Sequence, residues 1–135
     1  MDHEHQDDRP CRVLVVEDEV IVAMLLEDML ADLGFEVVGP ALDLQRALPL
    51  AQDADIDLAV LDVNLGNGRQ SFPIADVLRE RGVPFVFATG YGAAGLNQAY
   101  AGSLTLNKPF EARRLGEALK LTLRGTSCGG DGPRG

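Results

Sequence analysis

Short apolar stretches alternate along this chain with segments in which apolar residues recur every three or four positions. The short stretches are typical of buried strands, and the longer spacing is typical of amphipathic helices. The predicted strands are Arg12–Val16, Phe35–Gly39, Asp57–Leu61, Pro84–Ala88 and Ser103–Leu106. The predicted helices are Glu19–Leu33, Leu44–Gln52, Ser71–Arg81 and Glu111–Leu123, with a marginally helical segment at Ala93–Tyr100.

Capping and breaking residues lie at the ends of these elements. Asp18 and Ser71 are placed to cap the first and third helices, and Gly34 and Gly82 follow their last residues. Pro49 lies inside the second helix, where it removes a backbone donor and favours a kink.

The strict alternation of strands and helices predicts an α/β fold with a doubly wound, five-stranded parallel sheet. The first, third and fourth strands are almost wholly apolar and belong in the middle, whereas the second and fifth carry polar residues that suit edges. We therefore expect the flavodoxin-like order 2-1-3-4-5, in which the carboxyl ends of strands one and three flank the switch point. One domain is expected over residues 11–124, between disordered tails at residues 1–10 and 125–135.

Composition narrows the class of protein. The 135 residues are 46% hydrophobic with a mean hydropathy of +0.02, as in a globular protein that is soluble. A net charge of −9 argues against nucleic-acid partners and against anionic membranes. No apolar run approaches the length of a membrane span and the N-terminus is too polar for a signal peptide, so a cytoplasmic location is expected. Cys11 and Cys128 are accordingly expected to be thiols rather than a disulfide.

Polar residues capable of chemistry follow four of the predicted strands. Glu17 and Asp18 follow the first strand and Asp62 the third, while Thr89 and Lys108 follow the fourth and fifth. Each has an ordinary explanation by itself: a helix cap, a loop residue, a strand end or a surface charge. Because the carboxyl ends of parallel strands meet at one edge of the sheet, we expect all five side chains to lie together.

This set of groups fits phosphoryl chemistry. Carboxylates close together resist joint ionisation, and a hard cation such as Mg²⁺ removes the conflict while keeping several of its waters. A cation and the Lys108 ammonium would neutralise the oxygens of an incoming phosphoryl group, and the Thr89 hydroxyl would donate a hydrogen bond to one of them. A carboxylate would then attack phosphorus in line.

Four motifs resemble those of the receiver domains of bacterial two-component response regulators. They are Val15–Glu19, Leu61–Asp62, Ala88–Gly90 and Lys108–Phe110. The resemblance covers roughly the whole ordered chain and implies that Asp62 is the phospho-acceptor. It further implies that Mg²⁺ is held by Asp18, Asp62 and the backbone carbonyl of Asn64, with Glu17 acting through water.

The same resemblance implies that Thr89 and Lys108 hold the phosphoryl group and that the Lys108-Pro109 bond is cis. The stretch Phe85–Gly92 is similar to single-domain receivers with a Phe-Ala-Thr-Gly signature, which occur in alphaproteobacteria and are often served by histidine kinases of the HWE type.

Three departures from the common receiver pattern fit that subgroup and predict an unusual switch. Gly66 stands where most receivers have proline, Thr105 replaces the usual switch aromatic, and the fourth helix is degenerate. We hypothesise that Tyr91 repacks on phosphorylation and orders Ala93–Tyr100 as a partner-binding face. The alternative is that Tyr91 only shields the site from water.

The sequence thus predicts a free-standing receiver that accepts a phosphoryl group from a histidine kinase and signals through a downstream protein or a phosphotransfer partner. It would be no enzyme beyond its own phosphorylation and dephosphorylation. One alternative is a phosphate sink that drains a kinase. Another is a hydrolase of the haloacid-dehalogenase type, which normally needs a general acid two residues after the nucleophile, where this chain has Asn64.

Overall fold

The computed structural model describes residues 10–90 and 96–123, and the tails and the segment 91–95 lie outside it. Its five parallel strands form one sheet in the order β2-β1-β3-β4-β5, which confirms the predicted topology. The strands are β1 (Arg12–Val16), β2 (Glu36–Ala41), β3 (Leu58–Asp62), β4 (Phe85–Thr89) and β5 (Thr105–Asn107). The helices are α1 (Val20–Asp32), α2 (Leu44–Asp53), α3 (Phe72–Arg81) and α4 (Ala112–Thr122), with a 3₁₀ turn, η3 (Gln98–Tyr100).

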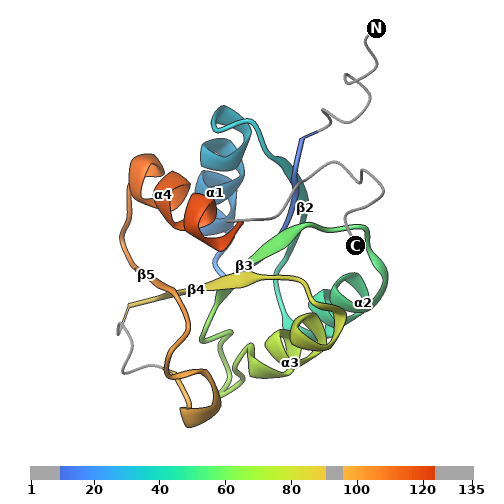
Figure 1. The fold of residues 1–135 in the computed structure, drawn as a ribbon. Helices are drawn as coiled ribbons and strands as arrows, with labels where there is room; N and C mark the ends of the chain where they lie inside the picture. Colours follow the sequence, from blue (N-terminus) through green and yellow to red (C-terminus); the bar gives the residue numbers. More distant parts are fainter. Residues whose placement is uncertain (1–9, 91–95, 124–135) are drawn as a thin grey trace, which may run out of the picture.

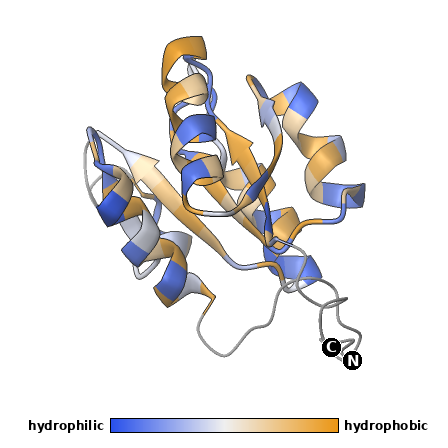
Figure 2. Cartoon of the chain, turned by 90° about the horizontal axis from the view of Figure 1, so that it is seen from above, coloured by the Kyte–Doolittle hydropathy of each residue, from blue (hydrophilic) through white to orange (hydrophobic). Residues whose placement is uncertain are grey.

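Two helical layers enclose the sheet (Figure 1). Helices α1 and α4 lie side by side on one face, and α2 and α3 lie on the other. Alternate residues of β1 divide between the two cores, Val13 and Val15 facing α1 and α4, Leu14 and Val16 facing α2 and α3. The central strands are buried on both faces, which explains their continuous apolar sequence. Figure 2 shows this contrast, with hydrophobic strands between helices that carry both kinds of residue.

Some predicted boundaries move. Strand β2 continues through Pro40 to Ala41, and as an edge strand it tolerates a residue without a backbone donor. Helix α2 continues through Pro49 to Asp53. The side chain of Asp43 caps this helix by accepting a 2.8 Å hydrogen bond from the Arg46 backbone nitrogen, and packing against the sheet stabilises it further.

One predicted helix cap is wrong, and another is right in position but makes no capping bond. Glu19, not Asp18, is the N-cap residue of α1, and its backbone nitrogen donates a 3.1 Å hydrogen bond to Glu17 Oε2. The Asp18 carboxylate is thereby left to lie beside Asp62. Ser71 does stand at the N-cap of α3, but its side chain makes no capping bond and its buried Oγ has no hydrogen-bond partner.

Helix α1 is apolar on two sides. Its inner side buries Leu26 and Leu30 against the sheet, as the spacing predicts. Its outer side exposes a second set of large apolar residues: Val20, Ile21, Met24 and Leu25. Burial against its own sheet therefore accounts for only part of the apolar sequence of this helix.

An aromatic cluster joins η3 to the sheet and to α3. The Tyr100 ring stacks on Phe72 with centroids 5.7 Å apart and meets Phe85 and Phe87 edge-on at 5.8 and 5.5 Å. Its hydroxyl donates a 2.6 Å hydrogen bond to Asp76 Oδ1. Burial and this bond raise the pKa of Tyr100 to about 12, so the hydroxyl keeps its proton at neutral pH.

Among residues 10–90 and 96–123, no helix combines the length and apolar character that a bilayer crossing needs. The expectation of two thiols is wrong for Cys11, which is disulfide-bonded in the structure. Two cysteines far apart in sequence give no sign of their distance in space, and this is why the spacing was uninformative. Cys128 itself lies outside the described residues.

Replacing Tyr100 with alanine should lower the free energy of unfolding by about 3–4 kcal/mol, because it empties the centre of the aromatic cluster. Tyr100→Phe keeps the ring and loses only the hydrogen bond to the exposed Asp76, so it should cost about 1 kcal/mol. Urea unfolding of both variants measures the difference. Equal losses would show that the hydrogen bond, not ring packing, holds η3 in place.

Candidate functional site

Strand register brings the predicted site residues to one edge of the sheet. Asp62, the last residue of β3, pairs with Ala88 of β4, next to Thr89. The Lys108 backbone nitrogen donates a 2.9 Å hydrogen bond to the Thr89 carbonyl, and this bond places Lys108 beside the end of β4. Glu17 is fixed in the same way, by a 3.0 Å bond from its nitrogen to the Ala41 carbonyl of β2.

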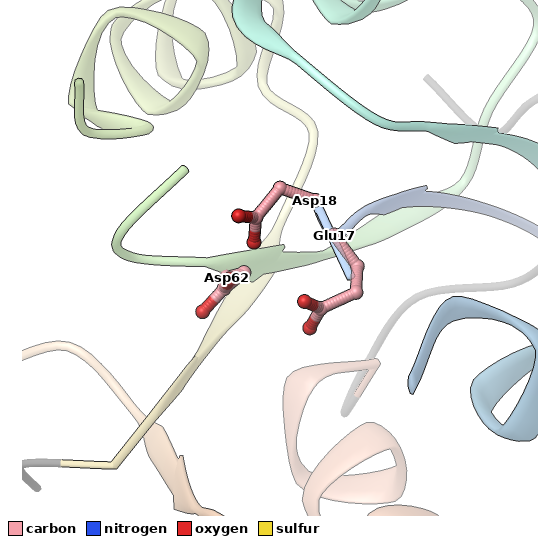
Figure 3. A group of neighbouring side chains, drawn as sticks. All are labelled: Glu17, Asp18 and Asp62. Carbon is pink, nitrogen blue, oxygen red and sulfur yellow. The ribbon is translucent and has the colours of Figure 1, made fainter. Parts of the chain in front are cut away.

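Three carboxylates gather at this edge (Figure 3). One oxygen each from Glu17, Asp18 and Asp62 lies within 4.8 Å of the others. Glu17 is fully buried, Asp62 is only 6% exposed, and Asp18 is half-buried. The arrangement offers hard oxygen ligands at a spacing that suits a small divalent cation.

Lys108 supplies the positive charge of the site. Its Nζ donates to Glu17 Oε1 at 2.9 Å and to Asp62 Oδ1 at 3.1 Å. With Glu17 Oε2 bound to the Glu19 nitrogen, both oxygens of the Glu17 carboxylate have protein partners. The Lys108-Pro109 peptide bond is cis, as the motif predicts.

Burial and the neighbouring charges shift the pKa values of two groups in the site. Burial, the charge of Glu17 and the contact with Asp18 outweigh the effect of Lys108 and raise the pKa of Asp62 from 3.8 to about 7. Burial alone would lower the pKa of Lys108, but its bonds and charge interactions with Glu17 and Asp62 raise that pKa above its ordinary value. Lys108 is therefore an ammonium, while Asp62 ionises reluctantly.

Two further predicted site residues, Thr89 and Asn64, lie near Asp62. Thr89 ends β4 and is buried beside the pairing partner of Asp62. Asn64 lies two residues beyond Asp62 with an exposed side chain, which forms a 3.5 Å hydrogen bond with Gln70 across an antiparallel bridge. The role of its backbone carbonyl as a metal ligand stays a prediction.

The structure describes only part of the predicted switch region. Thr105 lies on β5 and pairs with Phe87 of β4, and its replacement of the usual switch aromatic stays a prediction. Tyr91, the hypothesised substitute, lies outside the described residues. The sequence analysis missed Tyr100, which contacts Phe87 two residues before Thr89. Its only signal was an aromatic residue at the end of a polar segment.

Known proteins resemble both the fold and the sequence. A solution structure of SdrG from Sphingomonas melonis Fr1 superposes with a TM-score of 0.76 at 39% identity, covering 86% of this chain and 98% of that one. A response regulator receiver protein from Sinorhizobium medicae WSM419 superposes with a TM-score of 0.74 at 28% identity, over 85% of this chain and 95% of that one.

The transcriptional regulatory protein PdtaR of Mycobacterium tuberculosis is 33% identical over 117 residues, which are 84% of this chain. The chain spans only 57% of the length of that relative. The family model of the response regulator receiver domain matches residues 13–120, which include every predicted site residue. The chain belongs to the response regulator receiver domain family.

Proposed function

We propose that this protein is a cytoplasmic receiver that accepts a phosphoryl group on Asp62 from a histidine kinase and passes the signal on by protein contacts or phosphotransfer. Receiver domains are signalling modules that pair with histidine kinases. The observation that carries the proposal is the Lys108 ammonium, which contacts the Asp62 oxygen at 3.1 Å while Glu17 and Asp18 surround it.

The charges of the site support Mg²⁺ as the cofactor. A cation that binds Asp18 and Asp62 would offset the burial and the repulsion that raise the pKa of Asp62. Glu17 already uses both oxygens on protein groups, which fits a role through water better than direct ligation. When bound, Mg²⁺ would neutralise the carboxylates and the phosphoryl oxygens, and the Asn64 carbonyl is proposed as a further ligand.

The transfer step follows from the positions of Asp62, Lys108 and Thr89. An ionised Asp62 oxygen attacks phosphorus of the phosphohistidine in line, forming a P–O bond as the P–N bond breaks and its electron pair returns to the imidazole. The Lys108 ammonium then shifts its hydrogen bond from Asp62 to a phosphoryl oxygen. The Thr89 hydroxyl donates to another oxygen, and water later hydrolyses the acyl phosphate.

The outer side of α1 is proposed as the kinase-binding surface. Its first turns begin two residues after Asp18 and expose Ile21 and Met24, which are 73% and 57% accessible. An adjoining apolar pocket of ≈ 310 Å³ lies between α1 and the segment that follows β5, with Leu25, Phe110 and Lys108 in its lining. An apolar helix surface that carries the phosphohistidine can therefore bind α1 and reach Asp62 in one encounter.

Asp62→Asn should abolish phosphorylation, because the amide is no nucleophile. Incubating wild type and variant with a labelled phosphohistidine kinase and following the label measures this. Asp57→Asn is a matched control, since Asp57 is also a buried aspartate but contacts the Arg12 nitrogen at the opposite end of the sheet. Stable label on the Asp62 variant would place the acceptor elsewhere.

Asp62→Asn should also stabilise the protein at pH 8 in the presence of EDTA. The folded state holds the pKa of Asp62 near 7 against 3.8 for an unperturbed carboxyl, so stability is lost as pH rises from about 4 through 7. Removing the charge should recover about 2 kcal/mol at pH 8 and less at pH 5. Denaturant unfolding of both proteins at both pH values tests this, and a gain independent of pH would contradict it.

Ile21→Asn should slow phosphotransfer from the kinase about tenfold, as expected for the loss of one apolar contact at the centre of an interface. The fold should be unaffected because this side chain is 73% exposed. Leu121→Asn removes a similarly exposed apolar side chain near the far end of α4 and should change nothing. Initial rates at limiting kinase compare the two, and equal slowing would refute docking on α1.

A further inference from the structure

The loop between β3 and α3 is a tight, well-bonded hairpin rather than a loose connection. The Leu65 nitrogen donates to the Arg69 carbonyl and the Arg69 nitrogen donates to the Gly66 carbonyl, both at 2.9 Å. A third bond of 2.9 Å runs from the Ser71 nitrogen to the Val63 carbonyl, and the Leu65 side chain is buried in the core. The position of Gly66 is therefore fixed by its surroundings.

Gly66 faces one of the carboxylates of the site. Its φ is +82°, and a Cβ added there would lie 3.3 Å from Oδ2 of Asp18. That distance is shorter than an ordinary carbon–oxygen contact, so a side chain at residue 66 would displace the Asp18 carboxylate by a few tenths of an ångström. Because Gly66 has no side chain, there is room for the Asp18 carboxylate at its present position.

We propose that Gly66 is a positioning residue that sets the Asp18 carboxylate for Mg²⁺ and thereby favours Mg²⁺ over larger divalent cations. This inference rests on the proposed function, because it assumes a cation at Asp18 and Asp62. Mg²⁺ requires near-ideal octahedral geometry at short ligand distances, whereas Ca²⁺ accepts longer and more variable ones. Displacing Asp18 should therefore weaken Mg²⁺ much more than Ca²⁺.

Gly68 provides a matched control in the same hairpin. Its φ is +74°, so an alanine there bears nearly the same backbone cost as one at Gly66. A Cβ on Gly68, however, would meet nothing within 4 Å. Any effect common to both substitutions belongs to the backbone, and any effect confined to Gly66 belongs to the contact with Asp18.

The experiment is calorimetric titration of Mg²⁺ and of Ca²⁺ into the full chain, without kinase, for wild type, Gly66→Ala and Gly68→Ala. Gly66→Ala should lose about 5- to 10-fold in Mg²⁺ affinity and less than about 2-fold in Ca²⁺ affinity, given the different tolerance of the two cations. Gly68→Ala should retain both affinities. If the alanine variants fold poorly, the Gly66→Asn and Gly68→Asn pair replaces them, since asparagine accepts positive φ, as Asn67 does at +52°.

Equal loss of Mg²⁺ affinity in the two variants, or an unchanged ratio of Mg²⁺ to Ca²⁺ affinity in Gly66→Ala, would overturn the inference while leaving the proposed function intact. A wild-type protein that binds no Mg²⁺ would overturn both.

Discussion

Repulsion among carboxylates at one edge of the sheet is the constraint on which the rest of the site depends. Glu17, Asp18 and Asp62 are brought there by strand register, and the Lys108 ammonium offsets only part of their charge. Burial and this residual repulsion together raise the pKa of the Asp62 carboxyl above its ordinary value. A cation that enters this edge therefore meets a site whose own charges favour its binding, whereas an anionic phosphoryl group depends on that cation and on Lys108.

The aromatic cluster gives the site a mechanical connection to α3. Phe87 lies two residues before Thr89 on β4 and contacts the rings of Phe72 and Tyr100. The Arg79 guanidinium of α3 lies 4.3 Å from the centroid of the Tyr100 ring. A movement of the end of β4 would therefore shift η3 and α3, because their aromatic rings pack against Phe87. A threonine at residue 105 offers no comparable contact.

The sequence predicted the parallel sheet, its strand order and the meeting of Asp62 with Lys108, because apolar runs and topology determine strand ends. It mispredicted the cap of α1, where Glu19 is the N-cap residue and its nitrogen donates to Glu17. The other oxygen of Glu17 accepts from a lysine 91 residues away, a contact that local sequence does not reveal. Side-chain packing between residues distant in sequence, such as Tyr100 and Phe72, depends on the folded arrangement and leaves no periodic pattern in the sequence.

The two edge strands of the sheet have a consequence for how this protein associates. Strand β5 has only three residues, and β2 carries Glu36 and Pro40. A short edge and a proline-bearing edge are poor templates for backbone pairing with another chain. Although α1 exposes apolar side chains, the edge strands disfavour fibril-like growth by strand pairing. Association with other proteins should therefore use side-chain contacts, which are reversible.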